Sequence, residues 1–147
     1  MKFLIYGAGA IGCHIAYCMY QSGHEVVMVT RGKHYSSIKK KGLHIQICNN
    51  ENLIIDKILK EDSRFIFLDS LNKITEKNFD YLFITVKLND YNSQTLKNIS
   101  SYAQENTAVI PPCTKIPFWW LYNLQDLNNK KFNNTEIDIE TSKFFKK

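Results

Sequence analysis

The sequence predicts an α/β domain with a doubly wound, mostly parallel sheet. Short apolar runs alternate with segments whose apolar residues recur at helical spacing, and a glycine-rich turn joins the first run to the first such segment. The 147 residues are 44% hydrophobic and 22% charged, as in an ordinary globular protein. A chain of this length makes one domain and buries roughly two-thirds of its unfolded surface without a disulfide or a metal.

The opening residues predict a strand, a turn, a helix and a second strand. Phe3–Tyr6 and Val26–Val29 are short apolar runs of the kind found in buried parallel strands. Gly23 follows the segment between them, where a helix commonly ends on a residue with positive φ. The apolar residues of that segment recur at helical spacing and predict one buried stripe: Ile11, Ile15, Cys18 and Met19. Together they form a βαβ unit with a right-handed crossover.

The next segment predicts a short helix and three short strands. The helix covers 34–41 and ends near Gly42. Leu43–Ile47 alternates like a half-exposed strand, and Leu53–Ile55 and Phe65–Phe67 are further apolar runs. We expect the last two runs to belong to an antiparallel side sheet.

Tyr81–Val86 is the longest apolar run and predicts a central parallel strand. Either Asn89 or Asp90 supplies the side-chain cap of a helix that runs to about Tyr102. Ala108–Ile110 predicts another buried strand, and two prolines stop it because proline cannot donate to a strand ladder.

The rest of the chain changes character. Phe118–Leu121 is an aromatic cluster that either packs within the domain or meets a partner. Asparagine and lysine dominate from Asn128 onward, although Thr135–Ile139 alternates like an edge strand. We therefore expect a domain over 1–125 and a polar tail over 126–147.

Composition and charge argue against several classes of protein. Nineteen lysines and arginines against fourteen acids give a net charge of +5 without long runs, which disfavours nucleic acid as the partner. The four cysteines form no C-x-x-C pair and the four histidines follow no helix or strand period, so no metal site is expected. No apolar run reaches the ~20 residues of a membrane span. We expect a cytoplasmic protein that binds neither membrane nor nucleic acid.

The glycine-rich turn carries the main functional signal. It fits the motif G-x-G-x-x-G with the residues Gly7, Ala8, Gly9, Ala10, Ile11 and Gly12. Within a βαβ unit this motif binds the diphosphate of a dinucleotide: the first glycine makes the tight turn, the second lets the diphosphate approach the backbone, and the third lets the helix pack closely. The free N–H groups and the dipole of the following helix favour the anion. The alternative is a purely structural glycine turn.

Arg31 predicts the choice of cofactor. The residue about 20 positions beyond the motif meets the adenosine ribose, and a carboxylate there selects NAD(H). Here Arg31 follows the second strand, with Lys33 close behind, and a guanidinium pairs well with a 2′-phosphate. We therefore expect NADP(H); the alternative is an arginine that is merely solvated.

Two further residues follow strands at the same expected edge. Lys87 is a candidate to hold a phosphate or a substrate carboxylate, or to polarise a carbonyl. The alternative is a lysine that simply extends into solvent from the end of a buried strand. Cys113 has no positioned base in the sequence and is expected to be a structural thiol.

Taken together, these residues resemble the ketopantoate reductase family. The stretches that carry the resemblance are Lys2–Gly12, Gly23–Val26, Thr30–Gly32, Gly42–Leu43, Asp80, Val86–Lys87, Val109–Pro112 and Ile116–Trp120. The resemblance implies a Rossmann-like N-terminal domain of an enzyme that transfers a hydride from NADPH to 2-dehydropantoate or a related 2-ketoacid, in the biosynthesis of pantothenate and coenzyme A. It implies that the glycine turn, Arg31 and Thr114 hold the cofactor and that Lys87 lines the crevice for nicotinamide and substrate.

Two departures from the family pattern matter. The family usually has an Asn-Gly pair after the strand near Ile110, and this sequence has Thr114-Lys115, which keeps a hydroxyl but no amide. The family also continues into a helical domain that supplies the general acid and a substrate-binding carboxylate. We expect that C-terminal helical domain to be missing here or carried by a separate chain, and assign no catalytic residue to this chain. The alternative function is a non-catalytic NADP(H)-binding module or a truncated, inactive product.

Overall fold

Five parallel strands form the central sheet of the computed structural model, which describes residues 1–49, 52–87, 90–91 and 93–112. The strands lie in the order β5-β2-β1-β6-β7, and every neighbouring pair is parallel. Along the chain this sheet therefore has the order 3-2-1-4-5, which confirms the predicted doubly wound α/β fold. Its strands are β1 (Lys2–Tyr6), β2 (Glu25–Val29), β5 (Phe65–Leu68), β6 (Tyr81–Ile84) and β7 (Ala108–Ile110).

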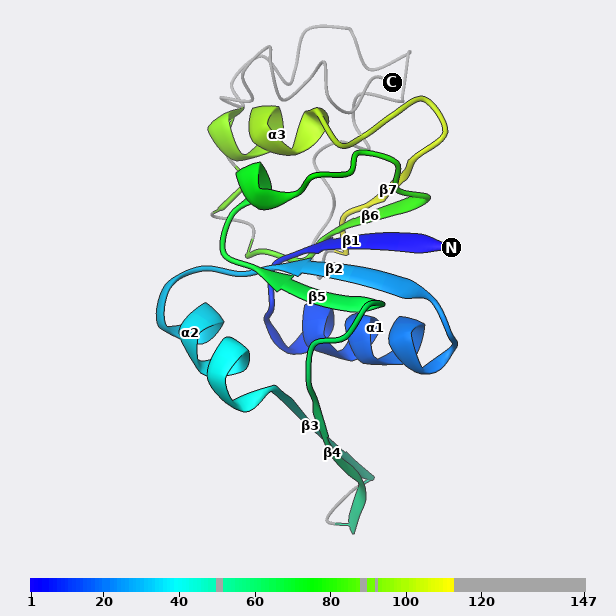
Figure 1. Ribbon diagram of the computed structural model, residues 1–147, viewed down its shortest axis with the longest axis vertical. Helices are drawn as coiled ribbons and strands as arrows, with labels where there is room; N and C mark the ends of the chain where they lie inside the picture. Colours follow the sequence, from blue (N-terminus) through cyan, green and yellow to red (C-terminus); the bar gives the residue numbers. More distant parts are fainter. Residues whose placement is uncertain (50–51, 88–89, 92, 113–147) are drawn as a thin grey trace, which may run out of the picture.

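Helices cover both faces of this sheet (Figure 1). One face packs against α1 (Ala10–Gln21), and the other packs against α3 (Ser93–Ser100). The first face also packs on the buried Ile38 of α2 (Gly32–Lys41), whereas the second also packs on Leu71 of a short 3-10 helix, η1 (Leu71–Lys73). None of the helices in the described ranges is long and apolar enough to cross a bilayer.

Alternation along the strands explains this layering. Phe3 and Ile5 of β1 join the cluster under α1, whereas Leu4, between them, joins the cluster under α3. Leu4 and Ile5 are fully buried, and so are Val26 and Met28 of β2. Strands buried on both faces read as continuous apolar runs, which is why the sequence predicts β1 and β2 well.

A two-stranded antiparallel hairpin extends from the body of the molecule (Figure 1). It pairs β3 (Leu43–Asn49) with β4 (Asn52–Leu59), as predicted for a side sheet. The prediction for Phe65–Phe67 was wrong: these residues belong to β5, which pairs in parallel with β2. The side chains of Phe65 and Phe67 are fully buried, and the Phe65 ring stacks on Tyr20 of α1 at 5.1 Å, so packing under α1 draws this run into the main sheet.

The end of β6, the start of α3 and the burial of Ile11 differ from the predictions. Strand β6 ends at Ile84, two residues early, and α3 begins at Ser93, so Asp90 lies outside the N-cap position. Ile11 is 48% exposed because the first turn of α1 lies beyond the carboxyl edge of β1; the buried positions of this helix are Gly12, Ala16 and Tyr17. Several predictions lie outside the described residues: Asn89, Cys113, Thr114, Phe118–Leu121, Thr135–Ile139 and the division at 125/126.

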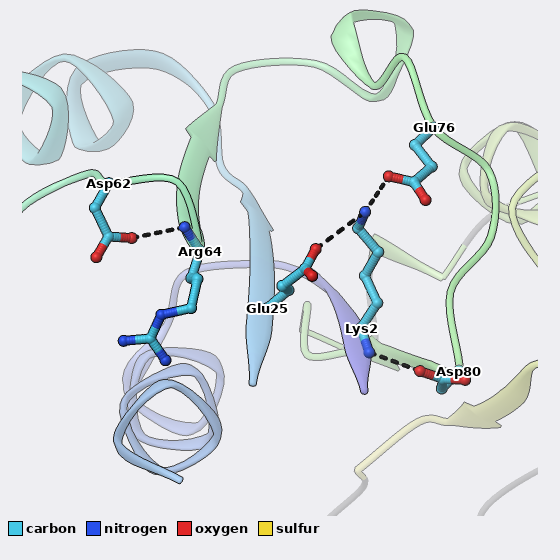
Figure 2. A network of polar contacts seen from close by, with 6 residues as sticks. All are labelled: Lys2, Glu25, Asp62, Arg64, Glu76 and Asp80. Atoms are coloured by element: carbon cyan, nitrogen blue, oxygen red, sulfur yellow. Dashed lines mark hydrogen bonds and ion pairs between the residues drawn. The ribbon is translucent and has the colours of Figure 1, made fainter. Parts of the chain in front are cut away.

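Lys2 joins three segments at the amino edge of the sheet (Figure 2). Its ammonium pairs with Glu25 of β2 at 3.2 Å and with Glu76, while its backbone N–H donates to Asp80 at 2.6 Å. Burial alone lowers the pKa of Lys2, but the hydrogen bonds to Glu76 and Glu25 outweigh that effect and raise it above its ordinary value. These contacts hold the start of β1 against both flanking segments, on the edge opposite the candidate site.

Candidate functional site

The candidate site lies where the strand order reverses. From β1 the chain first builds the sheet on one side, through β2 and β5, and then returns to build β6 and β7 on the other. Tyr6 and Ile84 are paired at the carboxyl ends of β1 and β6, so the segments that follow them leave the sheet side by side. Ligands of open α/β sheets bind in the crevice at such a reversal.

Thr85 fixes the two segments to each other. Its backbone N–H donates to the carbonyl of Tyr6 at 2.8 Å, and its hydroxyl donates to the carbonyl of Gly7 at 2.6 Å. Sequence reasoning missed this residue because it placed Thr85 inside the strand. The signal that could have found it is a hydroxyl within an otherwise apolar run, at the edge where the glycine turn also lies.

Gly7 and Gly12 are required by the protein's own packing. Gly7 has a φ of +114°, and a Cβ there would lie 2.9 Å from the backbone carbon of Thr85. A Cβ on Gly12 would lie 2.0 Å from the carbonyl oxygen of Gly7 and 2.5 Å from the hydroxyl of Thr85. The turn, the first turn of α1 and the end of β6 are therefore in contact through backbone atoms.

Gly9 differs from these two glycines because no packing requires it. Its φ is −76°, which any residue adopts, and no heavy atom lies within 4 Å of the position that a Cβ would take. It is the N-cap of α1, has no side-chain cap and is exposed. The absent side chain leaves open space directly beside the first backbone N–H groups of the helix, which have no partner within it.

The first turn of α1 suits an anion. It contains no acidic residue, and its N–H groups and dipole attract negative charge. Ala8 is buried in the turn, whereas Ala10 and Ile11 are exposed on the ligand side of the helix end. The residues present therefore fit the diphosphate of a dinucleotide.

Cys13 supports the turn without offering a nucleophile. Its thiol donates to the carbonyl of Ala8 at 3.3 Å. Burial raises the pKa of Cys13 to about 11, so it stays protonated near neutral pH.

Arg31 lies beside the glycine turn. The N–H of Gly7 donates to the carbonyl of Val29 at 2.9 Å, which places the turn next to the end of β2, and Arg31 follows two residues later as the N-cap of α2. Its side chain is 71% exposed, and its guanidinium lies 4.0 Å from the carboxylate of Asp90. Lys33 is exposed in the first turn of α2, which has no acid either.

Lys87 is exposed at the same edge, three residues after β6. Its carbonyl accepts the N–H of Asp90 at 2.8 Å, which forms a tight turn. The structure thus brings the glycine turn, Arg31 and the Lys87 segment to one edge, and Thr114 lies outside the described residues. Within the ranges described, no three histidines, cysteines or acids group together as a metal site.

Comparison with known proteins relates the chain to one family. The model of the family described as "Ketopantoate reductase PanE/ApbA" matches residues 3–112. A 2-dehydropantoate 2-reductase of Pyrococcus horikoshii is 40% identical over 50 residues, which is 34% of this chain and 17% of that protein.

Solved structures share the fold at low sequence identity. A protein described as a 2-dehydropantoate 2-reductase from Enterococcus faecalis superposes with a TM-score of 0.62 at 21% identity, over 82% of this chain and 36% of that one. A D-mandelate dehydrogenase solved with NADH and anilino(oxo)acetate superposes with a TM-score of 0.55 at 22% identity, over 76% of this chain and 33% of that one. The chain therefore spans about a third of the length of these structures and less of the curated relative.

Proposed function

Since the chain belongs to the ketopantoate reductase family, we propose that it provides the NADP(H)-binding part of a reductase for 2-dehydropantoate or a related 2-ketoacid. The observation that carries the proposal is the open space at Gly9, beside the uncapped start of α1 and at the reversal of strand order. Neither φ nor packing requires a glycine at this position. A diphosphate does, because it must approach the backbone there.

Each site residue has a proposed task. The N–H groups after Gly9 bind the diphosphate, and exposed Ile11 packs against the cofactor. Arg31 pairs with the 2′-phosphate, and Lys87 lines the crevice for nicotinamide and substrate. Thr114 completes the proposed cofactor site. When bound, NADPH would supply the hydride, and these residues of the chain would bind and orient it.

Substitution of Gly9 tests the proposal directly. Gly9→Ala adds a methyl group to space that is free of protein atoms, so the free energy of unfolding is expected to fall by no more than about 1 kcal/mol, the usual difference between glycine and alanine at an N-cap. The same methyl group blocks the diphosphate, so the Kd for NADPH in calorimetric titration is expected to rise by at least about tenfold. Gly12→Ala is the contrast, because it should lower stability and binding together. Unchanged NADPH affinity in Gly9→Ala would exclude a diphosphate at this turn.

A turnover assay separates a reductase from a binding module. The chain is mixed with NADPH and 2-dehydropantoate, and the absorbance of the reduced nicotinamide is followed. Steady loss of absorbance that depends on the ketoacid eliminates the pure binding module, whereas NADPH binding without turnover agrees both with the module and with a cofactor-binding part whose catalytic groups lie elsewhere.

A further inference from the structure

We infer that Asp90 sets the balance between NADP(H) and NAD(H) by competing with the 2′-phosphate for Arg31, an inference that rests on the proposed function. The Asp90 carboxylate lies 4.0 Å from the guanidinium that would bind that phosphate. Neither side chain is buried: they are 71% and 47% exposed. A dianionic phosphate that binds at Arg31 therefore comes close to a negative charge.

The Arg31–Asp90 ion pair joins segments on the two sides of β1. Arg31 follows β2 and Asp90 comes after β6, and β1 lies between these two strands. The ion pair thus spans the carboxyl end of β1, where the glycine turn begins. Any nucleotide that binds with its ribose at Arg31 must enter beside this contact.

Two hydrogen bonds hold the Asp90 segment in place. The N–H of Asp90 donates to the carbonyl of Lys87 at 2.8 Å, and the hydroxyl of the next residue, Tyr91, donates to the carbonyl of Ile84 at 2.6 Å. The backbone that carries the carboxylate is therefore tied to the end of β6. The anchored backbone keeps Asp90 close to Arg31, so its carboxylate stays near the position that an incoming phosphate would take.

The chemistry of the two nucleotides makes the competition selective. NADP(H) brings a phosphate that needs the guanidinium and is repelled by the carboxylate. NAD(H) brings a neutral 2′-hydroxyl, which carries no charge for the carboxylate to repel. Asp90 therefore disfavours the phosphorylated cofactor and leaves the other nearly unaffected.

Titration of both nucleotides into Asp90 variants tests the inference. At low ionic strength, Asp90→Asn is expected to bind NADPH about two- to tenfold more tightly than the wild type. The affinity rises because Arg31 is released from an exposed ion pair and because the carboxylate no longer repels the phosphate. The Kd for NADH is expected to change by less than about twofold. Asp90→Ser removes the same carboxylate and is expected to behave alike. In an Arg31→Gln background, the gain from Asp90→Asn is expected to shrink, because only the repulsion between the carboxylate and the phosphate is then left to remove.

Glu105→Gln is the matched control. It removes one negative charge from an exposed residue in the loop before β7, at the opposite edge of the sheet, and should alter neither affinity. An NADPH-to-NADH preference that stays the same in both Asp90 variants overturns this inference alone. Failure of every variant to bind either nucleotide overturns the proposed function and this inference with it.

Discussion

At the scale of single residues, the hydroxyl of Thr85 joins the end of β6 to the glycine turn after β1. It donates to the carbonyl of Gly7 at 2.6 Å and approaches that of Tyr6 at 3.2 Å, so one side chain links the ends of β1 and β6. The same oxygen lies where a Cβ on Gly12 would clash. The position of the glycine turn therefore depends on this threonine.

Thr85→Val tests that dependence. Valine has the same shape without the hydroxyl, so it leaves the Gly7 carbonyl with one partner fewer, and the free energy of unfolding is expected to fall by about 1–2 kcal/mol in urea denaturation. Because the turn loses its anchor, NADPH binding is expected to weaken as well.

Thr107→Val is the matched control for this loss of a hydroxyl. The Thr107 hydroxyl donates to the carbonyl of Phe79 at 2.8 Å, near the amino edge of the sheet and away from the glycine turn. It should lower stability to a similar extent and leave NADPH affinity unchanged. Equal weakening of NADPH binding in both variants would show that general stability, not the Thr85 anchor, controls the site.

At the scale of elements, Asp62 organises the turn that leads into β5. Its carboxylate accepts the backbone N–H groups of Arg64 and Phe65, both at 2.8 Å, and the hydroxyl of Tyr20 from α1 at 2.6 Å. The Tyr20 hydrogen bond, followed by the bond from the backbone of Arg64, lowers the pKa of Asp62 below its ordinary value of 3.8. The turn thus connects the edge strand to the helix that covers it.

Asp62→Asn is expected to change the response to acid. A carboxyl whose pKa is lower in the folded state stabilises the protein fully above its unfolded pKa, and that contribution is lost as pH falls through the folded pKa. The wild type should therefore lose stability below about pH 4, and the variant should lose less there while being about 1 kcal/mol less stable at pH 7. Urea midpoints from pH 2 to 7 measure both effects. Tyr20→Phe, which removes the largest cause of the shift, should show part of the same change, and identical acid slopes in all three proteins would contradict this account.

Strand and helix patterns in the sequence predicted most elements, because the buried strands are apolar on both faces and the glycine turn has a fixed spacing. The sheet that β5 joins could not be predicted. The short apolar run Phe65–Phe67 is equally compatible with an antiparallel hairpin and with the edge of a parallel sheet. The stacking of Phe65 on Tyr20, which favours the parallel sheet, is a contact between residues far apart in the sequence.

The candidate site was predicted only in part, for a similar reason. The glycine motif and Arg31 stand out in the sequence because their spacing is characteristic. Thr85 and Asp90 have no such spacing, and their importance comes from contacts across the reversal of strand order, with Gly7 and Arg31. The exposure of Ile11 also depends on where α1 begins relative to the sheet edge, which helical spacing alone does not define.

At the scale of the whole molecule, local stability should be uneven. Strand β1 is paired on both sides, and Leu4 and Ile5 are fully buried. Strand β4 has a single partner and carries Leu53, Ile54 and Ile58 at 51%, 61% and 58% exposure. The centre of the sheet and the hairpin therefore differ sharply in burial.

Amide hydrogen exchange should follow this difference. The N–H groups of Leu4 and Ile5 are expected to exchange only through opening of the whole sheet, and those of β4 through local opening that costs much less free energy. Exchange followed by NMR gives both values. Equal protection of the two strands would show that the hairpin and the sheet open as one unit.

The bond between Thr85 and Gly7 joins residues 78 positions apart. Bringing such distant parts of a chain together costs closure entropy that neighbouring elements do not pay. The opening strand, helix and second strand lie within the first 29 residues, yet Thr85, which binds the glycine turn, follows the fourth strand of the sheet. During synthesis on the ribosome, the glycine turn thus emerges long before the segment that fixes it, and the proposed nucleotide site can form only after β6 has paired with β1.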